Sequence, residues 1–329
     1  MMGEFAIRNL RAARGETARG FISIGETAAG PIQFPLVILH GREPGPTLCL
    51  TAGVHATEYP PIDAVLRTIQ SIRPAALRGT VIAVPVANLR MFESRLPFVS
   101  PLDGVNLNKA APGTPAGTIS QILAHVLLEE IIARASHHID LHGGDFGEML
   151  MPFCGYALTS NPAQDRDGEA LARCYGPKLI SLAGPDGKIP PFADGIVHAA
   201  CHRGVISLFA ESGGNGTLEE ADVLVHLNGI KNVMQHLGMI DGGPAPPGPR
   251  VKAKDRTVVR AAKGGLLRLR VAIGDEVRAG QEVAEIVDLF GEVVERVTST
   301  GAGFAGLVWG HKVVHTGDPI FRYWITEPA

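Results

Sequence analysis

The sequence predicts an α/β fold, built on a mixed and mostly parallel sheet flanked by helices and followed by a small all-β domain. Two observations support this prediction. Residues 31–240 alternate short apolar runs with longer amphipathic ones, which is typical of strands connected by helices. After a segment rich in Pro and Gly at 242–249, short strand-like runs and turns remain, without helical periodicity. We therefore divide the chain into a first domain at 1–245 and a β-rich domain at 246–329.

The first domain contains predicted strands and helices in alternation. Helices are predicted where apolar residues recur every three or four positions, at 62–69 and 119–127, and also at 167–175 and 194–202. A last helix is predicted to open with the capping box at 217–220 and to end near Leu237. In such sheets, ligands bind beyond the carboxyl ends of the strands. Buried strands are predicted for the apolar runs 35–40, 47–52, 80–86, 138–141 and 205–210.

Composition narrows the class of protein. Of the 329 residues, 45% are apolar and 19% are charged, as expected of a globular chain with a full core. The net charge of -3 gives no reason to expect nucleic acid or a membrane as a partner. The Cys residues form no disulfide-rich pattern, and residues 1–13 lack a signal-peptide core, so a cytoplasmic location is predicted. The sequence leaves open whether the chain forms a homo-oligomer.

Two short motifs predict a metal site. His55 and Glu58 follow one predicted strand, three residues apart, and His142 ends another. Two imidazoles and one carboxylate would fill three positions of a tetrahedral zinc ion and leave the fourth for water, as in hydrolytic sites. A polar loop and a solvated His are the simpler interpretation of either motif alone. Their shared position at strand ends favours one zinc ion per chain.

Two further carboxylates complete the predicted site. Asp140 lies two residues before His142, so on a strand it faces the same way and can orient that imidazole. Glu211 ends the apolar run 205–210 before a Gly-rich loop, which makes it a candidate general base at the same sheet edge. A surface Glu at a strand terminus is the alternative interpretation of Glu211.

A polar loop at 103–113 is the candidate substrate contact. Its two amides and one cation suit a substrate carboxylate or a polarised carbonyl oxygen. Asn108 and Lys109 are the predicted contacts within it, and Arg95 upstream can add a bidentate carboxylate contact. A turn and a solvated Arg are the alternative.

Together these motifs resemble those of the succinylglutamate desuccinylase/aspartoacylase family, a branch of the zinc-carboxypeptidase-like fold. The resemblance covers roughly residues 20–240. The segment 53–58 is similar to the first metal motif of the family, with Ala56 at a position where Gly is usual. The segment 140–142 matches the third-ligand motif, and Glu211 before Gly-rich sequence matches the catalytic Glu.

The loop at 103–113 departs from the family pattern. Asn106 stands where Asp is common, Lys109 where Arg is usual and Ala111 where Phe is usual. Lys is a point charge and Arg a planar fork, so bidentate capture of a carboxylate does not follow from the resemblance. Because of this exchange, a deacetylase of a diamino-acid derivative resembles the chain at least as well as an aspartoacylase or a desuccinylase.

The resemblance implies hydrolysis of a small N-acyl amino acid to a carboxylate and a free amine. The three predicted ligands would hold zinc. Glu211 would activate the water and return its proton to the leaving nitrogen, and Lys109 would steady the developing oxyanion. Arg95 and Asn108 would orient the substrate. A metallocarboxypeptidase acting on peptides and a non-catalytic metal-binding relative are the competing hypotheses.

The second domain resembles a biotinyl/lipoyl-type β hybrid. Gly274-Asp275 and Gly317-Asp318 are predicted to form tight turns between its strands. True carriers bear a Lys at a hairpin tip, whereas the corresponding turn at 288–292 contains none. We therefore expect this domain to shape or cover the mouth of the site and not to carry a cofactor.

Overall fold

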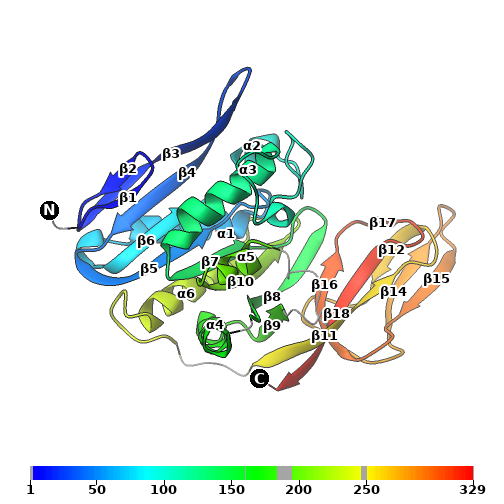
Figure 1. Cartoon of the computed structure of the whole chain (residues 1–329). Helices are drawn as coiled ribbons and strands as arrows, with labels where there is room; N and C mark the ends of the chain where they lie inside the picture. Colours follow the sequence, from blue (N-terminus) through cyan, green and yellow to red (C-terminus); the bar gives the residue numbers. More distant parts are fainter. Residues whose placement is uncertain (1–2, 160, 184–194, 246–249, 329) are drawn as a thin grey trace.

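The computed structural model describes residues 3–159, 161–183, 195–245 and 250–328. One twelve-stranded sheet runs through the molecule, with smaller sheets at its two ends (Figure 1). No described helix is long and apolar enough to cross a bilayer. The strands of the main sheet are, in spatial order, β13 (Glu276–Val277), β16 (Gly303–Trp309), β18 (Pro319–Pro328), β11 (Val251–Arg260), β9 (Leu179–Ala183), β8 (Glu148–Ala157), β10 (Ile206–Gly214), β7 (His137–His142), β5 (Glu43–Thr51), β6 (Arg78–Val84), β4 (Gly30–His40) and β3 (Glu16–Thr27).

The centre of the sheet is parallel, and its flanks are largely antiparallel. β6, β5, β7 and β10 pair in parallel. On one side β3, β4 and β6 form antiparallel pairs, and on the other β8 pairs antiparallel with β10. Only residues 143–147 connect β7 to β8, and so short a connection reverses the chain instead of crossing over the sheet. The mostly parallel sheet of the sequence prediction therefore describes the centre and not the whole.

Helices cover both faces of the sheet. α1, α4 and α6 pack on a core that includes Leu48 and Leu50 of β5, whereas α3 and α5 pack on a second core that includes Cys49. Successive strand residues point to opposite faces, which explains this division. The helices are α1 (Tyr59–Ser71), α2 (Leu89–Ser94), α3 (Ile119–His125), which continues as a π-helix at Val126–Ile131, α4 (Pro162–Tyr175), α5 (Ile196–His202) and α6 (Glu220–His236), with 3₁₀ turns at Pro74–Ala76, Leu107–Ala110 and Ile132–Arg134.

The capping box predicted before α6 does not form. The helix begins at Glu220, and the side chain of the preceding Glu219 makes no cap hydrogen bond. The hydroxyl of Thr217 instead donates a hydrogen bond to the carbonyl of Gly214 at 2.9 Å, which closes the turn after β10. The Thr217 side chain cannot close the turn after β10 and cap α6 at the same time, and the turn lies nearer.

The starts of α4 and α5 also refine the sequence prediction. α4 begins five residues before the predicted 167, at Pro162, because Asn161 accepts a hydrogen bond from the N–H of Ala163 at 3.0 Å and caps the helix. The helix predicted over 194–202 is α5, whose described part begins at Ile196; Asp194 lies outside the described residues.

The C-terminal strands continue the main sheet. β11 pairs in parallel with β9, and β16 pairs antiparallel with β8, so backbone hydrogen bonds join the two predicted domains. The boundary predicted at 245/246 adjoins residues 246–249, which lie outside the described residues. A third core around Phe321 and Tyr323 holds the outer strands together. The smaller sheets consist of β1 (Phe5–Ile7) and β2 (Leu10–Ala12) at one end, and of β15 (Val293–Thr298), β14 (Glu282–Val287), β12 (Gly265–Leu269) and β17 (Val313–Val314) at the other.

Candidate active site

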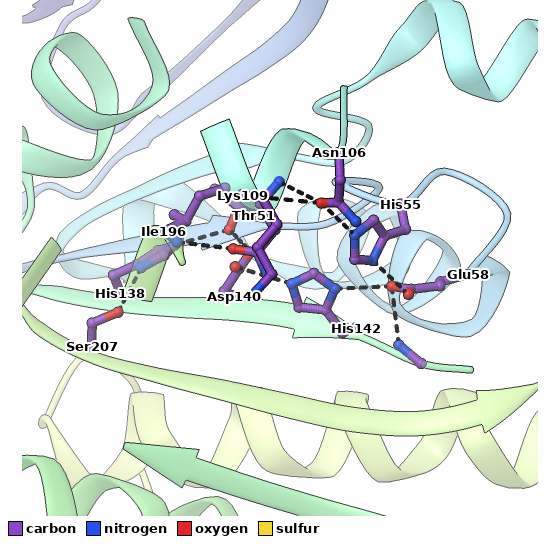
Figure 2. A network of polar contacts seen from close by, with 12 residues as sticks. Thr51, His55, Glu58, Asn106, Lys109, His138, Asp140, His142, Ile196 and Ser207 are labelled. Atoms are coloured by element: carbon purple, nitrogen blue, oxygen red, sulfur yellow. Dashed lines mark hydrogen bonds and ion pairs between the residues drawn. The ribbon is translucent and has the colours of Figure 1, made fainter. Parts of the chain in front are cut away.

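The predicted metal ligands and the candidate base meet near the carboxyl ends of three parallel strands. His142 is the last residue of β7, and the loop after β5 carries His55 and Glu58. Glu211 lies in β10 beside His142, because the two residues are register partners across this pair of strands. Figure 2 shows the polar network around the two imidazoles.

The loop between β5 and α1 is shaped by local constraints. Gly53 has a φ of 64°, and a Cβ there would lie 3.0 Å from the Cα of Val86, so any other residue would be strained and crowded. α1 then carries proline in its first turn, where backbone N–H groups have no helical partner. Glu58 is the N-cap residue of this helix, and His55 lies one turn of loop before it.

Three ligand atoms lie close enough to hold one metal ion. The Nδ1 atom of His55 is 2.9 Å from Oε1 of Glu58, and the Nδ1 atom of His142 is 3.0 Å from Oε2 of the same carboxylate. The ligand atoms of the three residues all lie within 4.8 Å of one another. The His55 side chain is 14% exposed, whereas those of Glu58 and His142 are 4% exposed, so the group opens on the His55 side.

Each imidazole is held from behind by a second polar group. The Nε2 atom of His142 lies 3.0 Å from Oδ2 of Asp140, and Nε2 of His55 lies 3.2 Å from Oδ1 of Asn106. A hydrogen bond at one ring nitrogen fixes which nitrogen is left to bind a metal. Both rings therefore direct Nδ1 at Glu58, as ligands of a common ion do.

A buried chain of hydrogen bonds continues from Asp140 into the sheet (Figure 2). The hydroxyl of Thr51 donates to Oδ1 of Asp140 at 2.5 Å and lies 2.9 Å from Nε2 of His138. Nδ1 of His138 is 2.8 Å from the hydroxyl of Ser207. Burial lowers the pKa of His138 to about 4, so this imidazole is neutral at physiological pH and serves as a fixed hydrogen-bonding group.

The carboxylates and imidazoles of the site stabilise each other's charges. Burial disfavours an ionised Glu58, but His55 and His142 outweigh it and hold the pKa of Glu58 below its usual value. Burial likewise opposes ionisation of Asp140, and His142 outweighs it, so the pKa of Asp140 is lowered. Burial also disfavours a charged His142, but Asp140 and Glu58 raise the pKa of this ring well above its usual value.

This arrangement fits a divalent cation. Within the described ranges, the ion pairs of Glu58 and Asp140 involve His side chains and neither Lys nor Arg. Asp145 is buried nearby, and its oxygens accept hydrogen bonds from the hydroxyl of Thr57 and from two backbone N–H groups. Two imidazole nitrogens and one carboxylate oxygen are a donor set that suits zinc, and a cation would balance the buried negative charge.

Glu211 lies on the wall of a cavity that His142 and Asp140 also line. Burial raises the pKa of Glu211 well above its usual value; His142 offsets part of the increase, and the carboxylates of Glu58 and Glu148 add to it. A raised pKa suits a group that takes a proton and later returns it. β10 does not end at Glu211, as the sequence suggested, but runs to Gly214 with a register shift against β8 just after Glu211. The cavity is lined by Asn108, Asp140, His142, Gly195, Val197, Phe209 and Glu211.

The predicted substrate-binding residues lie at different depths. Asn108 lines the cavity, and its Oδ1 accepts a hydrogen bond from the N–H of Ile196 at 2.9 Å. Lys109 is exposed on the same 3₁₀ turn, with its backbone N–H 3.4 Å from Oδ1 of Asn106. Arg95 is exposed at the end of α2, in a left-handed conformation with a φ of 54°. Of the three predicted residues, Asn108 is the one that reaches the cavity wall.

The sequence does not single out three residues that the structure brings to the site. Asn106 holds His55, Thr51 holds Asp140, and Glu148 lies near enough to raise the pKa of Glu211. Burial raises the pKa of Glu148 itself to about 7, with a further contribution from Glu58. The signal for Asn106 is present in the sequence, because this residue departs from the family pattern. Thr51 and Glu148 carry no comparable signal, since each depends on strands paired far apart in the chain.

Comparison with known proteins identifies the family. The succinylglutamate desuccinylase/aspartoacylase catalytic domain model matches residues 44–237. The chain belongs to this family. It is also 30% identical over 274 residues to the N-alpha-acetyl-L-2,4-diaminobutyric acid deacetylase of Halomonas elongata, a match that covers 82% of this chain and 78% of the relative. The resemblance predicted from the motifs is confirmed.

Solved structures share the fold over nearly the whole chain. A succinylglutamate desuccinylase/aspartoacylase from Rhodobacter sphaeroides matches with a TM-score of 0.82 and 26% identity, covering 95% of this chain and 94% of the other. The product-bound ectoine utilization protein EutE (DoeB) from Ruegeria pomeroyi matches with a TM-score of 0.86 and 21% identity, covering 95% and 96%. The C-terminal strands are therefore part of the shared fold. The chain is a deacylase-family hydrolase of linear amides, and the peptidase and non-catalytic alternatives are not favoured.

Proposed function

We propose that this chain is a zinc-dependent deacylase of small N-acyl amino acids, with one zinc ion held by His55, Glu58 and His142. The observation that carries the proposal is the direction of both imidazoles, which turn Nδ1 to the Glu58 carboxylate while other side chains hold their Nε2 atoms. Asp140 orients His142 within this group. The match to the deacylase family supports the same chemistry.

The proposed mechanism divides the work between the ion and Glu211. When bound, zinc polarises the acyl carbonyl and lowers the pKa of a water to about 7. Glu211 takes a proton from the water that attacks the acyl carbon, and then delivers this proton to the leaving nitrogen. Because burial raises its pKa, Glu211 is a stronger base when ionised and a ready proton donor once protonated. The products are a carboxylate and a free amine.

Residues of the 103–113 loop are proposed to hold the substrate. Asn108, on the cavity wall, orients the amide that is cleaved. Lys109 lies on the same turn and supplies a positive charge toward the oxyanion, and Arg95 orients the substrate from the outer surface. These three roles rest on the family resemblance and on the proximity of the loop to His55 through Asn106.

The first substrate to test is Nα-acetyl-2,4-diaminobutyrate. The Halomonas elongata relative is named for the deacetylation of this compound, and the identity of 30% spans most of both chains. Lys109 at the usual Arg position also separates this chain from a strict aspartoacylase pattern. N-acetylaspartate and N-succinylglutamate are the comparison substrates, because they carry a side-chain carboxylate in place of the amine, and the succinyl group adds another.

The experiment combines metal analysis with an assay of amine release. The purified protein is stripped with a chelator, assayed on the three substrates, and assayed again after titration with Zn²⁺. We expect activity to return at one equivalent of zinc and to be highest with the diaminobutyrate derivative. Hydrolysis that persists without metal, or a fully loaded protein that releases no amine from any of the three, would contradict the proposal.

A further inference from the structure

An arginine from the end of the chain lies on the same face of the sheet as Glu211. Arg322 of β18 is the register partner of Leu307 in β16. Leu307 is in turn the partner of Leu150 in β8, and Leu150 is the partner of Gly213 in β10. Directly opposed residues on neighbouring strands project from the same face. Arg322 therefore shares a face with Gly213; Glu211 lies before the register shift and is the partner of Phe153.

A row of aromatic side chains fixes the relation between these two strands. The ring centroids of Phe209 and Phe153 are 5.9 Å apart, and those of Phe153 and Trp324 are 5.4 Å apart. Glu211 follows Phe209 by two residues, and Arg322 precedes Trp324 by two, so each shares the face of its aromatic neighbour. β18 runs antiparallel to β10, since both β16 pairs and the β8–β10 pair are antiparallel. Both charged residues consequently lie on the same side of the aromatic row.

Among the described residues, Arg322 has an aromatic neighbour but no ion-pair partner. Its Cζ atom lies 5.4 Å from the ring centroid of Trp309, which is the register partner of Glu148. Its Nε atom is buried without a hydrogen-bond partner, and Arg322 forms no ion pair of 4.0 Å or less with any residue that the structure describes. Burial lowers the pKa of Arg322, and the charges of Glu148 and Glu211 partly restore it.

We propose that Arg322 binds the carboxylate of the N-acyl amino acid substrate. A desolvated guanidinium that lacks an anionic contact is costly, and a substrate carboxylate would supply the bidentate partner that its planar fork fits. The cation–π contact with Trp309 helps to position the guanidinium. Without this cation, the carboxylates of Glu148 and Glu211 would repel an anionic substrate. The assignment rests on the proposed deacylase function.

With Arg322 as the carboxylate contact, the C-terminal strands contribute a residue to the active site. Arg95 and Lys109, the cations predicted from the sequence, are exposed, whereas Arg322 is half-buried on β18, which β16 and β8 connect to β10. A contact from an exposed side chain is weakened by solvent, so the buried cation contributes more to carboxylate binding. Substrate recognition thereby requires that the C-terminal strands pair with the strands of the first domain.

The test compares a substrate with its uncharged analogue. Arg322→Met and Arg322→Lys are assayed on Nα-acetyl-2,4-diaminobutyrate and on the same compound with a primary carboxamide in place of the carboxylate. We expect Arg322→Met to lose about 100-fold in kcat/KM on the carboxylate, mostly through KM, and to change little on the carboxamide. Arg322→Lys keeps the charge but not the fork, and is expected to lose about 10-fold on the carboxylate.

Controls separate recognition from folding and from the proposed function. Arg296→Met removes an exposed arginine of the outer sheet that pairs with Glu282, and should leave both substrates unaffected. Zinc content and the midpoint of thermal unfolding report whether each variant is folded. An equal loss on the two substrates, or no loss on either, overturns the role of Arg322. A wild-type protein that hydrolyses neither compound overturns the deacylase proposal itself, and this assignment with it.

Discussion

The proposed metal-binding half of the site and its proposed substrate-facing half are built differently. His55, Glu58 and His142 lie on or beside central strands, and both nitrogens of each imidazole contact a neighbouring oxygen. The substrate-facing half draws on an exposed loop, where Lys109 lies, and on strands that arrive from the C-terminal part of the chain. A metal tolerates ligand errors of only a few tenths of an ångström, whereas substrate recognition can be supplied by separate elements. The residues that would hold the metal and those that would contact the substrate can therefore change independently in this fold.

The largest effect is expected at the metal-binding half. His142→Ala removes one ligand, and we expect the protein to lose zinc and about 10⁴-fold in kcat/KM. His137→Ala is the matched control. His137 is the first residue of β7, and its ring contacts the hydroxyl of Ser136 away from the site. Zinc stoichiometry and amine release measure both. If His142→Ala keeps a full equivalent of zinc, then His55, Glu58 and His142 do not form the metal site.

Glu211→Gln separates metal binding from proton transfer. The amide has nearly the same shape but cannot take a proton, so we expect about 10³-fold lower kcat with normal zinc content. Glu219→Gln, an exposed glutamate at the start of α6, is the control. Turnover equal to that of the parent would show that Glu211 is not the general base.

The buried chain behind His142 is expected to give an intermediate effect. Asp140→Asn weakens the hydrogen bond that holds the imidazole, and we expect zinc affinity to fall about 10-fold to 100-fold. Thr51→Val acts one step further away and should cost less, with the same sign. Competition with a chelator measures the dissociation constants. Unchanged zinc affinity in both variants would mean that the hydrogen bonds of Asp140 and Thr51 are not needed to hold His142 in place.

Glu148→Gln tests how the two halves interact through charge. The base must be ionised, so kcat/KM falls as pH drops through the pKa of Glu211, which lies above its usual value. Glu148 contributes to that increase, and its removal should lower the pKa of Glu211 and move the acid limb to lower pH. A pH–rate profile on the carboxamide substrate measures the shift. Movement of the limb to higher pH would reverse the assigned sign.

The smallest effect is expected at the outer surface. Arg95 is exposed, and exposed charges contribute little, so Arg95→Ala should change KM by less than about twofold. The measurement is made beside the Arg322 variants under the same salt conditions. A rise in KM as large as that of Arg322→Met would restore Arg95, the residue predicted from sequence, as the main carboxylate contact.

Much of the catalytic half could be predicted from the sequence because its signals are local. Glu58 follows His55 by three positions in one loop, and strand alternation alone places Asp140 on the side of His142. The apolar runs that carry these residues also predict the central strands. The capping box before α6 failed for a local reason as well, since Thr217 can close a turn or cap a helix and the sequence does not rank the two.

The sequence by itself determined the family and also predicted the proposed ligand set and base, because residue type and short spacing carry that information. Only the tertiary structure decided which cations approach the base, and that the C-terminal strands join the same sheet through β8 and β9. Arg322 and Glu211 are far apart in the chain, and nothing in either segment records their strand order. Pairing between distant strands is set by the packing of the whole fold, so the side chains that recognise the substrate emerge only when the sheet is complete.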